Sequence, residues 1–190
     1  MKKLLILAFV VIAVTFTAGC SHLGPVYYKA SQEYSFHPPA GWRYNMPDEH
    51  LAIFQSHSIK GSVFRPVMTV VVENTDLDTV EDYMEKQVVE LMKLPGFQKG
   101  EEDIIGMFEG RRLEYRYHNP RYKLPLRAIL QVFLRGGRVY AITCVSPRSH
   151  WKKFKGLFYD SLETFKFGDE AVPIGEKKDS YRKPELQTPK

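Results

Sequence analysis

The chain has 190 residues, of which 44% are hydrophobic and 26% are charged. This length and composition suit one globular domain and exclude a chain that is disordered throughout. The formal net charge is +5 and falls to +3 without Lys2 and Lys3, so the sequence gives no support for nucleic-acid binding.

The first 19 residues have the pattern of a secretory signal peptide. Lys2 and Lys3 precede an apolar run over 4–16, and Ala18 and Gly19 supply the small residues that a signal peptidase requires. A run of about 13 residues makes about 20 Å of helix, whereas the hydrocarbon core of a bilayer is about 30 Å thick. We therefore expect a cleaved leader over 1–19 rather than a permanent transmembrane helix.

The sequence Thr-Ala-Gly-Cys at 17–20 resembles the lipobox of bacterial lipoproteins, with Thr17 in place of the usual leucine. The resemblance implies that the leader is cut before Cys20 and that this residue is acylated on its sulfur and its new amino terminus. Two acyl chains give stable anchoring, because each buried CH₂ contributes about 0.8 kcal/mol. The alternative is an ordinary signal peptide with an incidental cysteine. By analogy with lipoproteins of diderm bacteria, Ser21 implies an outer-membrane protein facing the periplasm.

The second cysteine, Cys144, lies in the strand-like sequence VYAITCVS. If Cys20 carries lipid, the chain has no second thiol with which Cys144 could form an internal disulfide. A buried thiol of low reactivity is expected in such a strand, because no neighbouring residue in the sequence supplies a base.

Residues 20–32 read as the lipidated cysteine and a polar tether, and residues 33–167 as the folded domain. Within that domain, strands are predicted at 34–37, 51–57 and 66–74. The segment 66–74 is apolar at both odd and even positions, which predicts a central strand covered on both faces.

A helix is predicted to follow residue 78. Asp78 and Glu81 have the spacing of a capping box, and Pro95-Gly96 marks the end of the segment. The apolar residues recur at helical spacing and comprise Val80, Met84, Val88 and Leu91.

The second half of the domain predicts a strand at 109–118 and a hairpin formed by 126–135 and 138–146. The Gly136-Gly137 turn would pair Phe133 with Tyr140 and Ile129 with Cys144. A closing helix over 149–167 is predicted, with Ser149 as its cap. Its apolar face comprises Trp151, Phe154, Phe158, Leu162 and Phe165. Residues 168–190 are polar and aperiodic and are predicted to be a disordered tail.

This order of elements predicts an α+β fold, a mainly antiparallel β-sheet flanked by helices. Four stretches resemble the PsbP/Mog1-like superfamily, which includes PsbP-like lipoproteins of unknown function: YSFHPPAGW (34–42), VMTVVVEN (67–74), FLRGGRVYAITC (133–144), and the segment from Trp151 to SLETFKF (161–167). The resemblance covers about residues 33–167 and implies an α/β/α sandwich that serves as a non-catalytic binding or accessory module.

The sequence contains no recognisable enzyme motif, so we predict no catalytic residue, no cofactor and no metal. His50 and His57, with Asp48 and Glu49, match no compact metal-site spacing. Asn74, Asp76, Asp78 and Glu85 have the spacing of an EF-hand, but Thr79 stands where that loop needs glycine.

The most suggestive segment is RRLEYRYHNPRYKLPLR over 111–127, in which basic residues alternate with tyrosines. It supplies a candidate partner surface, which comprises Arg112, Arg116, His118, Arg121, Tyr122 and Lys123. Alternation places Leu113, Tyr115 and Tyr117 on the opposite face. The segment is either a strand with a solvated charged face or a site for lipid headgroups, an acidic glycan or an acidic protein. Export would separate it from RNA.

The leading hypothesis is a lipid-anchored, non-enzymatic envelope protein that acts through protein–protein contacts. The alternative is a periplasmic binder or carrier of a small or lipidic ligand in a pocket between sheet and helices. A third possibility is an enzyme whose acid and base residues are brought together only by folding.

Overall fold

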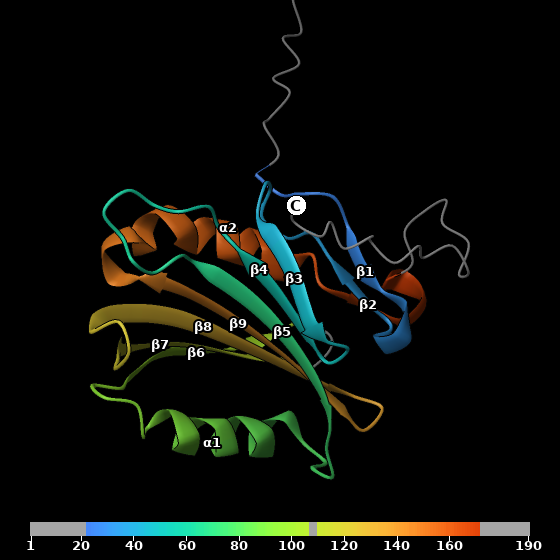
Figure 1. The fold of residues 1–190 in the computed structure, drawn as a ribbon. Helices are drawn as coiled ribbons and strands as arrows, with labels where there is room; N and C mark the ends of the chain where they lie inside the picture. The colour runs from blue at the N-terminus through green and yellow to red at the C-terminus, as the bar shows by residue number, and fades with distance from the viewer. Residues whose placement is uncertain (1–21, 107–109, 172–190) are drawn as a thin grey trace, which may run out of the picture.

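The computed structural model describes residues 22–106 and 110–171. Its main feature is a seven-stranded sheet with strand order β3-β4-β5-β9-β8-β7-β6, in which every neighbouring pair is antiparallel. A smaller sheet of order β1-β2-β10 lies beside it. One helix covers each face of the large sheet (Figure 1). The predicted α+β sandwich with a mainly antiparallel sheet is therefore confirmed.

The elements follow one another along the chain with short connections. They are β1 (Tyr27–Lys29), η1 (Ala30–Gln32), β2 (Tyr34–Phe36), β3 (Arg43–Asp48), β4 (Leu51–Gln55), β5 (Val67–Asn74), α1 (Val80–Leu91), β6 (Gln98–Ile105), β7 (Gly110–Asn119), β8 (Leu124–Arg135), β9 (Arg138–Pro147), η2 (Arg148–His150), α2 (Trp151–Glu163), β10 (Lys166–Phe167) and η3 (Gly168–Ala171).

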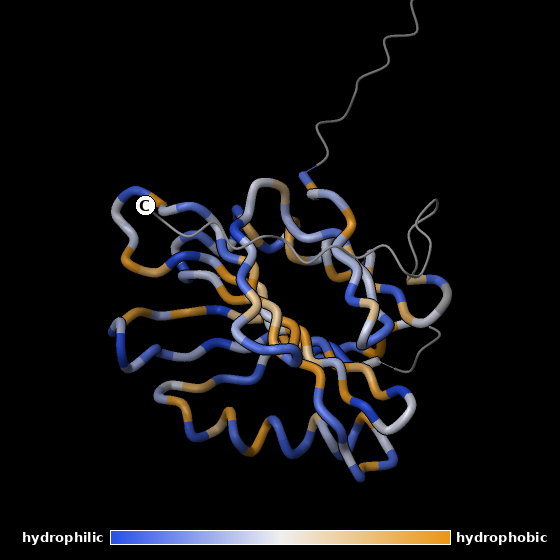
Figure 2. Tube along the Cα trace, turned by 45° about the vertical axis from the view of Figure 1, so that its right-hand side comes forward, coloured by the Kyte–Doolittle hydropathy of each residue, from blue (hydrophilic) through white to orange (hydrophobic). Residues whose placement is uncertain are grey.

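Two hydrophobic cores lie on opposite faces of the large sheet. The core beneath α2 is rich in aromatic rings and includes Phe36, Phe54, Phe133 and Phe158. The core beneath α1 is mainly aliphatic and includes Leu113 together with Val80 and Met84 of the helix. The central strands carry the densest run of apolar residues, whereas α1 alternates between apolar and polar residues (Figure 2). Burial on both faces explains why β5, β8 and β9 are apolar at nearly every position.

The hairpin of β8 and β9 has the predicted register. Phe133 pairs with Tyr140 and Ile129 pairs with Cys144. The two turn residues have the positive φ angles of 58° and 71° that a tight hairpin turn requires, and glycine adopts them without steric cost. Cys144 is fully buried, and burial raises the pKa of its thiol well above the ordinary value. Both observations agree with the predicted unreactive thiol.

Both predicted helix caps are wrong. Thr79, rather than Asp78, caps α1, because its hydroxyl accepts a hydrogen bond from the backbone N–H of Asp82 at 3.1 Å. Ser149 lies within the 3₁₀ turn η2 and does not cap α2. The predicted closing helix also runs too far. It ends at Glu163, and Lys166–Phe167 form β10 because they pair with β2.

The predicted domain boundaries are also too narrow. The predicted tether is folded over most of its described part, since Leu23 bridges to Pro39 and Tyr27–Lys29 pair with β2. At the other end, Gly168–Ala171 form a 3₁₀ turn and Ala171 is buried. The predicted leader (1–19), Cys20 and residues 172–190 of the predicted tail lie outside the described residues. Among the helices that the structure does describe, none is long and apolar enough to cross a membrane.

Strands β3 and β6 were not predicted. They form the two edges of the large sheet, and most of their residues are exposed. An exposed edge strand has no buried face and therefore shows no hydrophobic alternation in the sequence.

Two glycines provide a test of this packing. A Cβ at Gly110 would lie 2.5 Å from a ring carbon of Phe133, whereas a Cβ at Gly156 in α2 would meet nothing within 4 Å. Gly110→Ala should lower the free energy of unfolding by about 1–3 kcal/mol, because the buried ring has to move. Gly156→Ala should raise it by about 0.5–1 kcal/mol through helix propensity. Urea denaturation measures both changes, and equal effects of the two substitutions would contradict the described core.

Candidate functional site

Five of the six residues of the predicted partner surface are exposed. Arg116 and His118 lie near the end of β7, and Arg121, Tyr122 and Lys123 lie in the turn that follows.

The turn 120–123 is held in place by specific contacts. The side-chain oxygen of Asn119 accepts hydrogen bonds from the backbone N–H groups of Arg121 and Tyr122, both at 3.0 Å. The ring of Tyr122 packs edge-on against Phe64 of the loop 56–66, with 5.6 Å between ring centroids. The Arg121 guanidinium lies 5.5 Å from the centroid of the Tyr122 ring. These contacts join two connections that are far apart in the sequence.

His118 joins a third connection to this surface. Its backbone N–H donates a 2.7 Å hydrogen bond to the carbonyl of Pro95 in the segment 92–97, which connects α1 to β6. Its ring lies so close to Gly96 that a Cβ there would be 2.5 Å from Nδ1. His118 therefore positions a neighbouring loop as well as facing solvent.

Arg112 does not belong to an exposed surface, so this part of the prediction is wrong. Only 7% of the residue is exposed, because α2 covers its face of β7. Its Nε donates a 2.8 Å hydrogen bond to the side-chain oxygen of Gln131, and its guanidinium lies 4.6 Å from the centroid of the Tyr159 ring. The same helix covers Glu114, so the predicted solvated charged face of β7 is covered at Arg112 and Glu114 and exposed only at Arg116 and His118.

Glu114 is the centre of a polar network beneath α2. It accepts hydrogen bonds from the Tyr159 hydroxyl at 2.6 Å and from Arg127 at 3.2 Å, and it forms an ion pair with Lys155 at 2.6 Å. Burial by itself would raise the pKa of this carboxyl group. The hydrogen bonds from Lys155 and Tyr159 and the charges of Lys155 and Arg127 outweigh that effect, so the pKa lies below its ordinary value. The network links α2 to the sheet, and the role of Glu114 in it is structural.

Positive charge collects at the end of the large sheet that carries the turn 120–123. Four connections meet there, 56–66, 92–97, 120–123 and 148–150, and none of them contains an aspartate or glutamate. Lys93 pairs with Glu90 of α1. We call the remaining positive groups, with Arg116 of β7, the basic end; they are Lys60, Arg65, Arg116, Arg121, Lys123 and Arg148.

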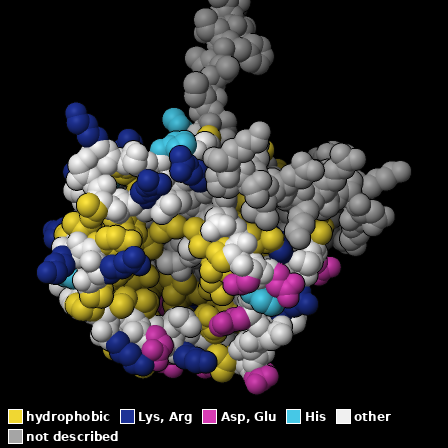
Figure 3. Space-filling view, viewed as in Figure 1, with side chains coloured by type: hydrophobic (Ala, Val, Ile, Leu, Met, Phe, Trp, Pro, Cys, Tyr) yellow, Lys and Arg dark blue, Asp and Glu magenta, His cyan; other side chains and the backbone are white. Residues whose placement is uncertain are grey.

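The connections at the opposite end of the sheet have the opposite charge. The described ones are 49–50, 75–79, 136–137 and Gly106, and they carry Glu49, Asp76 and Asp78 but no lysine or arginine. On the visible face, Lys and Arg side chains gather on the side of the β7–β8 turn, and Asp and Glu side chains gather on the other side (Figure 3). The connections at the two ends of the sheet therefore differ in charge, although two strand residues beside the 136–137 turn, Arg135 and Arg138, are basic.

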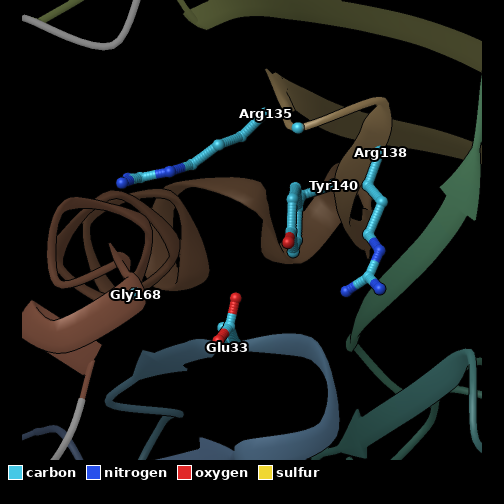
Figure 4. Close-up of a pocket in the computed structure, with 6 residues that line it drawn as sticks. Glu33, Arg135, Arg138, Tyr140 and Gly168 are labelled. Atoms are coloured by element: carbon cyan, nitrogen blue, oxygen red, sulfur yellow. The ribbon is translucent and has the colours of Figure 1, made fainter.

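The structure also contains a hollow that was not predicted from the sequence. It has a volume of about 310 Å³, lies beside the β8–β9 turn, and is lined by Glu33, Arg135, Gly136, Arg138, Tyr140 and Gly168 (Figure 4). Two residues of its lining, Arg135 and Arg138, could have been noticed in the sequence, because they stand close to the Gly136-Gly137 turn on either side. Because Glu33 and Gly168 reach the hairpin only through the small sheet, their place beside it could not be predicted from local pattern.

No catalytic arrangement emerges from the residues that the structure describes. Within them, no group of three or more His, Cys, Asp or Glu side chains could hold a metal ion. Asp48 accepts a backbone hydrogen bond from His50 at 2.8 Å, and Glu49 contacts the same histidine at 3.3 Å on the exposed β3–β4 turn. Both contacts are between neighbouring residues of the turn and stabilise it locally.

Neither a protein-family model nor a curated protein sequence matches the chain. Solved structures do match it. LpqN of Mycobacterium tuberculosis, described as involved in cell envelope biogenesis, has a TM-score of 0.55 and 15% identity, over 71% of this chain and 83% of LpqN. The cyanobacterial PsbP protein (CyanoP) of Synechocystis has a TM-score of 0.54 and 14% identity, over 80% of this chain and 95% of CyanoP.

The structure of the Ran-binding protein Mog1p of Saccharomyces cerevisiae is about as similar to this chain as those of LpqN and CyanoP. Its TM-score is 0.56 and its identity 10%, over 77% of this chain and 96% of Mog1p. At these identities the likeness shows the fold alone. The chain has a PsbP/Mog1-like α+β fold, which is the fold that the resemblance of its sequence implies.

The network around Glu114 makes a prediction for stability. Glu114→Gln should lower the free energy of unfolding by about 2 kcal/mol at pH 7, since hydrogen bonds to a charged group are lost. A carboxyl group whose pKa is lowered by folding stabilises the protein above its unfolded pKa, near 4.5, and this contribution is lost as the pH falls through the folded pKa. The difference between variant and parent should therefore shrink at pH 3.

Urea denaturation at pH 7 and pH 3 measures this difference. Glu163→Gln is the matched control, because Glu163 is an exposed residue of α2, the helix whose Lys155 and Tyr159 contact Glu114. A difference for Glu114→Gln that does not change between the two pH values would contradict a stabilising ionised carboxylate.

Proposed function

We propose that the protein is a lipid-anchored, non-enzymatic accessory module of the cell envelope, and that its basic end docks onto an acidic surface of a protein partner. The observation that carries the proposal is the positive charge of the basic end, where none of the four connections contains an aspartate or glutamate. A one-signed surface steers an oppositely charged partner during encounter and selects against partners of like charge.

The composition of the basic end favours a protein as the partner. Alongside its arginines it exposes Tyr122, which is 38% accessible, and Val63 of the adjoining loop, which is 72% accessible. Tyrosine and arginine are enriched at the centres of protein interfaces, whereas lysine is depleted there. The contacts of Tyr122 with Phe64 and Asn119 keep this surface in place before binding, which reduces the entropy lost when a partner docks.

Lipid attachment at Cys20 would hold the domain close to the membrane. The chain is fixed to the fold from His22 onward, because the His22 carbonyl accepts a 2.9 Å hydrogen bond from Ala40 and Leu23 bridges to Pro39. Leu23 is the third residue after Cys20, a distance of about 10 Å when the chain is fully extended. Under this proposal the partner is itself in the membrane or close to it.

The structural neighbours are compatible with this setting. LpqN is described as a protein of cell envelope biogenesis, and CyanoP belongs to the PsbP proteins. In a diderm source, we infer from Ser21 that the protein is attached to the outer membrane and faces the periplasm.

Lipidation can be tested by substitution. Cys20→Ala should release the protein from the membrane fraction and abolish its labelling with radioactive palmitate, because the acylated sulfur is lost. Cys144→Ala is the control and should keep both properties, since Cys144 is buried in the core. Unchanged fractionation and labelling of Cys20→Ala would disprove the lipoprotein assignment.

The docking surface can be tested by crosslinking in living cells of the source organism. A photo-crosslinking amino acid at position 122 should capture one protein, and the same amino acid at Val89, an exposed residue of α1, should not. Adding Arg116→Glu and Arg121→Glu should lower capture about tenfold or more, because four units of charge change at the interface.

A matched pair of substitutions controls for net charge. Lys86→Glu and Lys166→Glu change the net charge equally at exposed positions outside the basic end, and capture should persist. The melting temperatures of both double variants should be close to that of the parent. Equal capture by the two double variants would contradict the proposal that the basic end is the docking surface.

A further inference from the structure

We propose that the hollow beside the β8–β9 turn binds a small zwitterion, a molecule with an ammonium group and a carboxylate or phosphate group, together with an apolar substituent. This site is separate from the basic end and lies at the other end of the sheet. A volume of about 310 Å³ is within the range of small-molecule sites.

The hydrogen-bond acceptors of the hollow lie together on one side. Glu33 lies across from the hydroxyl of Tyr140 in the hollow (Figure 4). That hydroxyl donates its proton to the backbone carbonyl of Gln32 at 3.0 Å, so its oxygen is left with acceptor capacity only. Because Arg138 already interacts with the Tyr140 hydroxyl, the Glu33 carboxylate is the group of the hollow that would bind an ammonium group.

The hydrogen-bond donors come from the two strands of the hairpin. Arg135 and Arg138 are directly paired across the hairpin, and their side chains lie on either side of Tyr140 (Figure 4). Guanidinium groups bind carboxylate and phosphate through paired hydrogen bonds.

The backbone at Glu33 supports a functional role for this residue. Glu33 has a φ angle of 55°, in the left-handed region that residues other than glycine rarely adopt. It is held there by two hydrogen bonds, from its own N–H to the Ala30 carbonyl at 3.3 Å and from the Gly168 N–H to its carbonyl at 2.8 Å. Glu33 ends the 3₁₀ turn η1 in this conformation, and its fixed backbone sets the direction in which its side chain leaves the chain.

The apolar part of the ligand is indicated by a neighbouring hollow. A space of about 230 Å³ is lined by Phe133, Leu134, Arg135 and Phe167. It shares Arg135 with the polar hollow, so one molecule can place its charged groups in the polar hollow and an apolar group against the two phenylalanines. An amino acid with an aromatic side chain has all three groups. A phosphoethanolamine headgroup has the two charged groups and would leave the apolar space to the acyl chains of its lipid.

The test uses the purified full-length chain labelled with ¹⁵N-glycine and titrated with L-phenylalanine and, separately, with O-phosphoethanolamine. The amide signals of Gly136, Gly137 and Gly168 should shift, because these glycines lie in or next to the hollow. The signals of Gly61, in the loop 56–66, and Gly156, in α2, should not shift. A response to the first probe alone identifies an amino acid, and a response to the second alone identifies a headgroup.

Two analogues divide the zwitterion into its halves. 3-Phenylpropanoate lacks the ammonium group, and 2-phenylethylamine lacks the carboxylate. Glu33→Gln should weaken binding of the zwitterion about tenfold and leave 3-phenylpropanoate unaffected. Arg135→Gln or Arg138→Gln should weaken the zwitterion and 3-phenylpropanoate equally and leave 2-phenylethylamine unaffected. Arg148→Gln, which removes an arginine at the basic end, should change none of these affinities.

The proposal fails if neither zwitterion shifts the three glycine signals at 10 mM, which is about tenfold above the weakest dissociation constant of interest. It also fails if the variants at Glu33, Arg135 and Arg138 bind as tightly as the parent while their glycine spectra remain native. Failure here would leave crosslinking at position 122 unaffected, because that experiment reports on the opposite end of the sheet.

Discussion

Burial of β8 on both faces is the constraint on which the rest of the structure depends. From Ala128 to Phe133 every residue of this strand is buried, with the α2 core on one face and the α1 core on the other. Truncating a residue of this kind to alanine typically costs about 2–5 kcal/mol, so the strand tolerates few polar groups. The exception is Gln131, whose buried amide is hydrogen-bonded through both of its polar atoms. Its oxygen accepts from Arg112 at 2.8 Å, and its nitrogen donates to the Leu162 carbonyl at 3.4 Å.

This constraint leaves the ends of the sheet as the places where the protein can interact with other molecules. Both faces are covered, and the connections at each end carry the polar and charged residues. Connections on a rigid sheet can change without loss of the core, which is why binding residues gather on them. The basic end and the hollow at the β8–β9 turn lie at opposite ends of the strands. A protein partner and a small ligand therefore need not compete for the same surface.

The same reasoning explains why the structural neighbours do not reveal the partner. LpqN, CyanoP and Mog1p share the fold with this chain at 10–15% identity. A sandwich of this kind needs apolar residues on its central strands and on one side of each helix, and many sequences meet that requirement. Similarity of fold therefore does not identify a partner.

The sequence by itself determined the central strands, the two helices and the hairpin register, because these features produce short-range patterns of apolar and turn residues. Alternation along β7, the continuous apolar runs of β5 and β9, and the helical spacing in α1 and α2 each reflect contacts of one element with a core. The Gly136-Gly137 turn determined the register of the hairpin, because the turn type fixes which residues face each other. The lipobox-like leader belongs with these local signals, and it remains a prediction.

Only the tertiary structure decided which charged residues are exposed. Arg112 and Arg116 occupy equivalent positions in the alternation of β7, yet α2 covers the first and leaves the second in solvent. Likewise, Glu33 lies beside Tyr140 only because β1, β2 and β10 form a second sheet against the first. Such placements depend on where a distant helix or strand packs. The alternation of a strand shows which residues share a face, but it does not show how far a distant element covers that face.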